Sequence, residues 1–241
     1  MFCAPAMRVR ASIIQREKNM ERKSIRSHMQ AIEERFNADN LSLYVCDNPD
    51  ELPALLREVG KKGVHPMSKV SEEELSSGRA FWLFLRKADR CIICISAKLV
   101  DLHGQDFGDY FRSLAAARYN GRNDIVASVS QPLIDELRGR LIYFGGIEVA
   151  PDERGGIRRL GDFAQYVKLL AAMRWDFDWM YTIVAYKHRR LADDYGFNGK
   201  YRNAICWADP IPEGLANDQM ILGLNAVHFS HIVSSVEPGK L

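Results

Sequence analysis

The stretch Leu141–Leu160, LIYFGGIEVAPDERGGIRRL, constrains the fold of this 241-residue chain more than any other segment. It opens with an apolar run that predicts a strand, passes through a turn rich in glycine and arginine, and ends where helical spacing begins. A strand that empties into a glycine turn leaves the N-terminus of the next helix open. Unpaired backbone N–H groups and the helix dipole then converge on one spot, which favours a bound phosphate group.

A helix and a second strand follow this turn. Trp179–Tyr186 is rich in β-branched and aromatic residues, which is typical of a strand. The order strand, turn, helix, strand predicts one parallel βαβ crossover. The apolar face that marks the intervening helix consists of Ile157, Leu160, Ala164, Val167 and Ala171.

The other predicted strands pair in the antiparallel sense. Ala80–Arg86 and Cys91–Val100 are joined by the short link KADR and predict a hairpin. Leu41–Asp47 predicts a further strand, and Tyr201–Trp207 and Met220–Val233 predict two closing strands. The sequence therefore predicts a mixed α/β (α+β) fold: a largely antiparallel sheet, flanked by helices, with a central βαβ crossover.

Several shorter elements complete the predicted organisation. Helical spacing predicts a helix over Arg22–Phe36, within an N-terminal helical extension that covers residues 1–40. The main domain then covers residues 41–241, with an insert near 103–138. That insert holds two predicted helices, Phe107–Tyr119 and Pro132–Leu137.

Two helix starts are predicted from capping residues. Asn48 or Asp50 is expected to cap a short helix that ends at Gly60. Ser71 and Glu74 have the spacing of a capping box for another short helix.

Composition narrows the class of protein. The chain has 33 Lys and Arg against 31 Asp and Glu, a formal net charge of +2, so charge gives no reason to expect a nucleic-acid partner. It has no apolar run long enough for a membrane span and no apolar core typical of a secretory signal. The five cysteines are odd in number and scattered, which fits a reducing, cytoplasmic setting. Cys91 and Cys94 lie on a predicted strand, where residues three apart face opposite sides, so we interpret them as buried apolar cysteines.

The segment from Leu141 to Val233 resembles the GNAT superfamily of acyl-CoA-dependent N-acyltransferases. Three pieces carry the resemblance: the strand and turn IEVAPDERGG, the later HRRLADDYGF, and the two closing strands. The resemblance implies that an acyl-CoA lies in a splay between the two central strands. Acetyl-CoA or another acyl-CoA would be the co-substrate, and no metal is expected.

The resemblance also implies the residues that hold CoA. Its pantetheine would lie along Ile147 and Val149, and its pyrophosphate would rest on the glycine turn. The turn departs from the family pattern, because its second glycine comes one position early and an arginine takes the expected small position. Either the loop is one residue shorter, with its arginines aimed at the phosphates, or the site is degenerate. The turn residues expected to bind phosphate are Arg154, Gly155, Gly156, Ile157, Arg158 and Arg159.

Two residues are candidates for the chemistry. The resemblance implies that Tyr195 protonates the leaving thiolate, although a tyrosine can also simply close the preceding helix. Glu148 lies between Ile147 and Val149, an apolar setting that suits a general base, and the alternative is an edge carboxylate that faces solvent or pairs with arginine. Tyr181 and Tyr186 are weaker candidates, because tyrosines on strands mostly pack.

Other polar residues carry less weight. His188 opens a predicted helix, where a solvated role is common, and Asp176 and Asp178 more often cap or turn. His228 and His231, placed on a predicted strand, would face opposite sides and make no metal pair.

The resulting hypothesis is an N-acyltransferase that transfers an acetyl or longer acyl group from acyl-CoA to a small-molecule amine. Two alternatives remain. One is a non-catalytic protein of the same fold that binds a ligand or a partner. The other is an enzyme fed by acyl carrier protein, similar to N-acyl amino acid or homoserine lactone synthases. Pairing through the C-terminal strands would make a homodimer.

Overall fold

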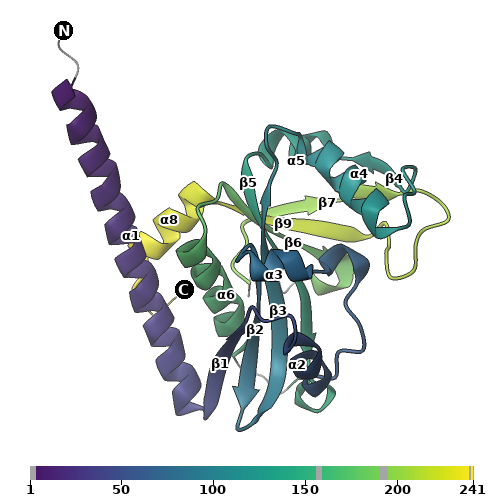
Figure 1. Cartoon of the computed structure of the whole chain (residues 1–241), viewed down its shortest axis with the longest axis horizontal. Coiled ribbons are helices and arrows are strands. Elements are labelled where there is room, and N and C mark those ends of the chain that lie inside the picture. Colours follow the sequence, from purple (N-terminus) through teal and green to yellow (C-terminus); the bar gives the residue numbers. More distant parts are fainter. Residues whose placement is uncertain (1–3, 156–158, 190–194, 239, 241) are drawn as a thin grey trace.

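A computed structural model describes residues 4–155, 159–189, 195–238 and 240, with side chains described from Asn19 onward. Within these residues, seven strands form one sheet in the order β1-β2-β3-β5-β6-β9-β7, and β5 and β6 are its one parallel pair (Figure 1). Helix α6 makes the crossover between them. The predicted mixed fold with a central βαβ crossover is confirmed. The strands of this sheet are β1 Leu41–Cys46, β2 Ala80–Lys87, β3 Arg90–Asp101, β5 Arg140–Val149, β6 Trp179–Ala185, β7 Gly199–Arg202 and β9 Gln219–Asn225.

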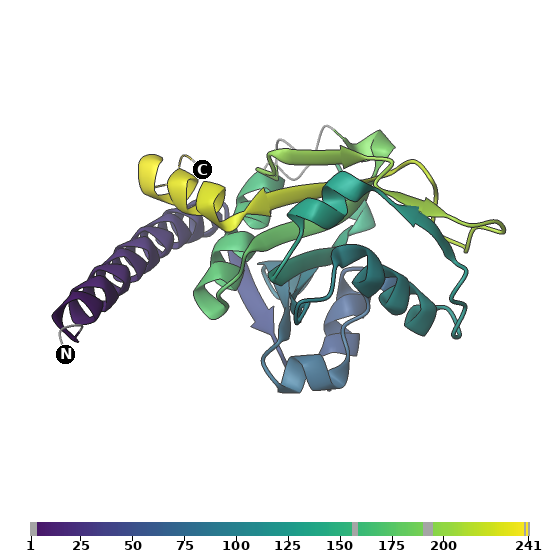
Figure 2. The same cartoon turned by 90° about the horizontal axis from the view of Figure 1, so that it is seen from above.

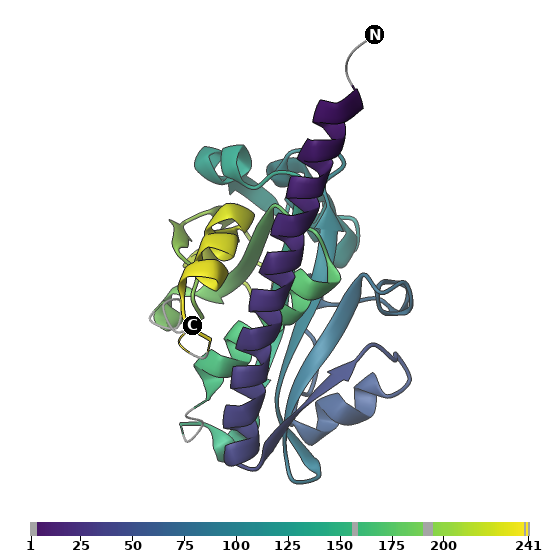
Figure 3. The ribbon, with the colours of Figure 1, turned by 90° about the vertical axis from the view of Figure 1, so that its left-hand side faces the viewer.

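Helices cover both faces of the sheet. Three of them, α1, α6 and α8, contribute side chains to the main core on one face, and Figures 2 and 3 show α1 running beside α8. Helices α2, α3, α4 and α5 cover the opposite face and bury two further clusters of apolar residues. The bounds are α1 Ala4–Ala38, α2 Leu52–Glu58, η1 Pro66–Ser68, α3 Glu72–Ser76, α4 Phe107–Arg118, α5 Gln131–Glu136, η2 Pro151–Glu153, α6 Leu160–Arg174, η3 Tyr186–His188 and α8 Ala226–Ser235.

The N-terminal helix is longer than predicted. It spans 35 residues from Ala4, whereas apolar spacing indicated a start at Arg22. That spacing reports only the part of α1 that packs on the body, where Ile25, Ile32 and Phe36 are buried. Figure 3 shows the first turns extending past the body. No helix among the described residues is both long and apolar enough to cross a membrane.

The two closing strands were predicted wrongly in detail. Tyr201–Trp207 divides at Asn203, whose φ is +49°, into β7 and β8 Ile205–Trp207. Strand β8 leaves the main sheet and pairs with β4 Val126–Val129 of the insert. Met220–Val233 divides at Asn225, whose side chain accepts a hydrogen bond from the His228 backbone N–H and caps α8.

Capping and turn predictions had mixed outcomes. The Ser71–Glu74 capping box is present, and Gly60 ends α2 with a φ of +82°. The cap predicted for α2 was wrong, because Glu51 occupies that position without a side-chain cap. Asn48 instead accepts a hydrogen bond from the Asp50 backbone N–H, a local turn that competes with capping.

The orientation predicted for Cys91 and Cys94 was wrong. Both thiols are buried in the same cluster, beneath α2 and α3. The register between β2 and β3 shifts at Leu85 and Arg86, so Ile92 lies between two paired positions and the alternation of side chains reverses. A β-bulge therefore brings two residues three apart to one face.

A second β-bulge lies in β5, where this strand pairs with β3. Ser96 pairs with Gly145 and Cys94 pairs with Glu148, so two residues of β5 face one residue of β3. Gly146 lies in this bulge with a φ of +66° and leaves no room for a side chain. A Cβ atom there would lie 2.9 Å from the Trp82 ring. Only glycine meets both requirements.

Gly146→Ala is therefore expected to lower the free energy of unfolding by about 1–3 kcal/mol, because alanine is strained in this conformation and meets the buried Trp82 ring. Urea denaturation measures the change. Gly63→Ala is the matched control, since no atom lies within 4 Å of its added Cβ. Equal loss in the two variants would contradict the role given to the bulge.

Candidate active site

The two parallel central strands separate part of the way along the sheet. Strands β5 and β6 pair from Leu141↔Trp179 to Phe144↔Thr182. Beyond Phe144, β5 stays paired with β3, and β6 stays paired with β9, as far as Val149 and Ala185. The pairing between β5 and β6 stops where the bulge begins. A wedge-shaped opening thus interrupts the middle of the sheet.

A cavity fills this opening. Its walls are the bulged part of β5, Thr182–Val184 of β6, and the side of α6 that faces the sheet. Tyr195 and Phe197 close one side, and Ser68 and Tyr143 border the other. The walls are mostly apolar, with few polar groups, which is the usual character of a small-molecule site.

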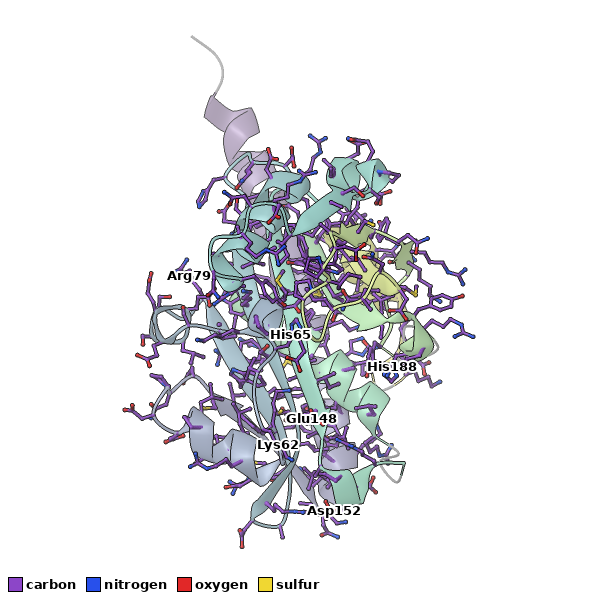
Figure 4. All side chains as sticks on the ribbon, turned by 90° about the vertical axis from the view of Figure 1, so that its right-hand side faces the viewer. Lys62, His65, Arg79, Glu148, Asp152 and His188 are labelled. Carbon is purple, nitrogen blue, oxygen red and sulfur yellow. The ribbon has the colours of Figure 1, made fainter. Side chains whose placement is uncertain are left out.

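The bulge also sets the direction of Glu148. Strict alternation along β5 would place Glu148 with Ile142 and Phe144, in the main core under α6. The extra residue reverses the pattern, so Ile147 and Val149 pack on that core and Glu148 turns to the opposite face. In Figure 4, Glu148 lies below His65 and above Asp152, with His188 to the right.

Two cations hold the Glu148 carboxylate. Arg154 Nη2 lies 2.7 Å from Oε1, and Lys61 Nζ lies 3.7 Å from Oε2. The Glu148 side chain is 29% exposed, while that of Lys61 is 8% exposed. Both ion pairs lie beside the point where the sheet opens.

Seven of the eight residues predicted to hold CoA fall in three groups. Ile147 lines the cavity, and Val149 packs beside it on the core. Arg154 donates a hydrogen bond from Nε to the Val149 carbonyl as well as contacting Glu148, and Gly155 follows in open space with a φ of +81°. Gly156, Ile157 and Arg158 lie outside the described residues. Their predicted roles stay predictions.

Arg159 joins two helices. Its Nε donates to Asp39 at 2.7 Å and its Nη1 donates to Asp162 at 3.3 Å, which ties the start of α6 to the end of α1. The hydrogen bond to Asp39 raises the pKa of the guanidinium. Arg35 holds the same Asp162 at 2.6 Å. In this structure the charge of Arg159 is balanced by carboxylates.

Tyr195 directly follows residues 190–194, which lie outside the described residues and take up most of the short helix predicted there. Its side chain lines the cavity and is 8% exposed. Its backbone carbonyl and that of Gly196 accept hydrogen bonds from Lys168 Nζ, at 2.5 and 3.3 Å. Gly196 has a φ of +64°, and a Cβ there would lie 2.9 Å from the same Nζ. Lys168 thus fixes the backbone that carries Tyr195.

Lys168 is a site residue that sequence reasoning missed. It is 3% exposed, lies 5.2 Å from the Phe197 ring centroid, and lines the cavity from the middle of α6. Burial lowers the pKa of its amine to about 7. The available signal was its position on the predicted apolar face of the helix, four residues after Ala164 and three before Ala171.

A second pocket adjoins the first on the opposite side of the sheet. The two share Ser68, Tyr143 and Ile183 on their walls. Ser68 Oγ and the Tyr143 hydroxyl are hydrogen-bonded at 3.1 Å, and burial raises the pKa of Tyr143. His65 lines the second pocket from the loop before η1. Sequence reasoning missed this residue too, because nothing near it in the chain marks a site.

The remaining sequence candidates have other surroundings. Tyr181 is fully buried, and its ring centroid lies 5.0 Å from that of Tyr143. The Arg189 and Arg202 guanidinium groups lie over the Tyr186 ring, each 4.7 Å from its centroid. The Asp178 carboxylate accepts a hydrogen bond from the Arg140 backbone N–H, so it joins the paired ends of β5 and β6.

Three histidines lie on other elements than the sequence predicted. His188 is exposed at the end of η3. His228 and His231 lie on helix α8 rather than on a strand, so their predicted opposite orientation does not apply. Among the residues that the structure describes, no group of three or more His, Cys, Asp or Glu side chains could hold a metal ion.

Comparisons with known proteins give structural matches only. No protein family and no curated protein matches the sequence. FeeM, an N-acyl amino acid synthase from uncultured soil microbes, is 12% identical with a TM-score of 0.43, covering 78% of this chain and 92% of its own. Arabidopsis thaliana NAA60, solved with acetyl-CoA, is 12% identical with a TM-score of 0.45, covering 78% and 99%. The Escherichia coli ribosomal-protein-S18-alanine N-acetyltransferase is 13% identical with a TM-score of 0.40, covering 77% and 93%.

The amine of Lys168 makes stability depend on pH. Its pKa is 10.5 in the unfolded chain and about 7 in the fold, so between these values the unfolded chain binds a proton that the fold excludes. The contribution of Lys168 to the free energy of unfolding therefore rises with pH across that window, by about 1.4 kcal/mol per pH unit at most.

Lys168→Met is expected to remove this dependence. Urea denaturation at pH 7.5, 8.5 and 9.5 gives the free energy of unfolding of wild type and variant. The wild-type value should rise relative to that of the variant as pH rises. The exposed Lys62→Met serves as control and should show a constant difference. A constant difference for Lys168→Met would contradict the buried, neutral amine.

Proposed function

We propose that this protein is an acyl-CoA-dependent N-acyltransferase of the GNAT type, which binds its acyl donor where β5 and β6 separate. The observation that carries the proposal is the cavity in the middle of the sheet. Residues 145–149 of β5 face that opening with backbone groups that β6 does not pair. A pantetheine arm carries two amides, which can pair with such a strand edge in the way that another strand would.

The turn after β5 would take the phosphates. Arg154 lies on the exposed surface beside Gly155, directly after the strand edge, and α6 starts shortly beyond. A helix N-terminus preceded by glycines and arginine suits a pyrophosphate. In this proposal Arg154 exchanges its contact with Glu148 for a phosphate oxygen. Gly156, Ile157 and Arg158 complete the predicted cradle.

Each of the two candidate residues transfers one proton in the proposed reaction. The acceptor amine attacks the thioester carbonyl carbon, and its proton passes to the Glu148 carboxylate. The tetrahedral intermediate collapses, the C–S bond breaks, and the Tyr195 hydroxyl protonates the thiolate. The products are an amide and free CoA. Lys168 acts through the backbone of Tyr195 and keeps that residue against the cavity.

A non-catalytic ligand-binding protein of the same fold is the second candidate. The pairing of Arg159 with Asp39 and Asp162 favours it, because this arginine then contributes little charge to a phosphate site. Supply of the acyl group by acyl carrier protein is a further variant of the enzyme, which a comparison of acyl-CoA with acyl carrier protein as donor distinguishes. The free buried cysteines fit a reducing, cytoplasmic setting.

Millimolar CoA is expected to raise the melting temperature. A ligand present at a hundred times its Kd stabilises the fold by about 2.7 kcal/mol, and differential scanning fluorimetry detects such a change. Val184→Trp, which fills the cavity wall, should remove the shift, and Val227→Trp at an exposed site should keep it. No shift in the wild type would refute the proposed function.

Tyr195→Phe is expected to lower turnover about a hundredfold or more with little change in CoA affinity, because it removes the acid but keeps the ring. Release of free thiol from acetyl-CoA in the presence of an amine panel measures turnover. Tyr186→Phe, outside the cavity, is the control and should retain full activity. Full activity in Tyr195→Phe would rule out the acid role.

A further inference from the structure

The pocket around His65 has the location expected of a second substrate site. It lies on the face of the sheet opposite α6 and reaches the splayed strands through Tyr143 and Ile183, which line both cavities. A molecule in this pocket, here called the acceptor pocket, would approach the open part of the sheet from the side that the proposed CoA leaves free. The inference rests on the proposed function.

The proton on the His65 ring can be assigned from its contacts. Nδ1 accepts a hydrogen bond from the Met67 backbone N–H at 3.3 Å, so this nitrogen carries a lone pair. Burial, assisted by Lys61, lowers the pKa of the imidazole and keeps the ring neutral. The single ring proton of a neutral imidazole must then be on Nε2.

This Nε2–H group is a buried donor without a partner among the described residues. A buried donor normally finds an acceptor, so the unmade hydrogen bond indicates a place for a ligand atom. Gly214 packs against the ring, where an added Cβ would lie 3.1 Å from Nε2. The loop that carries Gly214 thus covers this part of the ring, and His65 and Gly214 both line the acceptor pocket.

A second donor lies on the same pocket wall. Gln219 Oε1 accepts a hydrogen bond from Trp207 Nε1 at 3.0 Å. This contact fixes the orientation of the amide, and the opposite end of that amide is an NH₂ group, which can only donate. No Asp or Glu is among the described residues that line the pocket, and Met67, Trp207 and Leu215 make its apolar walls.

We infer that the acceptor pocket binds an amine that also carries a carbonyl or carboxylate oxygen and an apolar body, with His65 Nε2–H donating to that oxygen. The absence of a carboxylate from the described walls disfavours a plain cationic amine, which would need one. His65 is then a specificity-determining residue rather than the base, because its Nε2 already carries the proton. Amino acids, amino amides and the N-terminus of a peptide share this chemistry.

Three matched amines test the inference. Leucine carries a carboxylate, leucinamide carries a carbonyl, and 3-methylbutylamine has the same apolar body with neither oxygen. The wild type should favour leucine or leucinamide over 3-methylbutylamine by about tenfold or more in kcat/KM, because a site built to hydrogen-bond an oxygen rejects the analogue that lacks it. Preference for the acid or for the amide identifies which oxygen is bound.

The variants separate this inference from the proposed function. His65→Ala should bring the ratio close to one by lowering kcat/KM for the favoured amine, while leaving the CoA-induced thermal shift unchanged. His65→Gln, which retains a side-chain donor, should recover part of the preference. Equal kcat/KM for all three amines in the wild type, or a ratio that His65→Ala leaves unchanged, overturns the inference although the protein binds CoA. If CoA does not raise the melting temperature of the wild type, the proposed function itself is rejected.

Discussion

The bulge at Gly146 is the constraint on which the rest of the structure depends. One extra residue in β5 ends its pairing with β6, turns Glu148 away from the core, and opens a cavity in the middle of a seven-stranded sheet. The positive φ of Gly146 and the closeness of the Trp82 ring keep the bulge at that position. Without it, regular alternation would bury a carboxylate under α6, which costs several kcal/mol unless the group is paired.

Polar side chains on both sides of this opening are held by hydrogen bonds or ion pairs to other protein groups. Below the sheet, Lys168 holds the backbone of Tyr195 and Gly196 with two hydrogen bonds. Above it, Lys61 and Arg154 hold Glu148. Each arrangement joins an element of the sheet layer to a loop, so the opening has firm walls although its strands are not paired. Such preorganised polar groups are what a catalytic site requires.

The sequence predicted most elements but not their exceptions. Apolar periodicity located β2, β3, β5 and β6 and the crossover helix, because these segments bury one regular face. Bulges and caps break that regularity with a single residue. The shift near Arg86 put Cys91 and Cys94 on one face, and Asn225 converted a predicted strand into a strand followed by a helix. A prediction from apolar spacing rests on a window of several residues, so it misses a change of direction made by one residue.

Candidate site residues were predicted where a sequence motif contains them, and they were missed where only the tertiary structure brings them to the cavity. Tyr195 and Glu148 stand in recognisable segments. Their assigned roles remain predictions, but the structure places Tyr195 on the cavity wall and Glu148 beside the point where the strands separate. His65 and Lys168 gain their character from burial by elements distant in the chain. Nothing in the sequence reports the lone donor of His65, and only its position on the apolar face of the helix points to the burial of Lys168.

The opening in the sheet has an energetic consequence of its own. Strand edges are normally exposed at the margin of a sheet, where water satisfies their N–H and C=O groups. Here the unpaired edges of β5 and β6 face each other in a mostly apolar cavity near the centre, where few waters can replace the missing ladder. A fold with such an opening is stabilised when an extended molecule with amide groups binds in it. The open sheet is therefore itself a reason to expect a ligand shaped like a short strand.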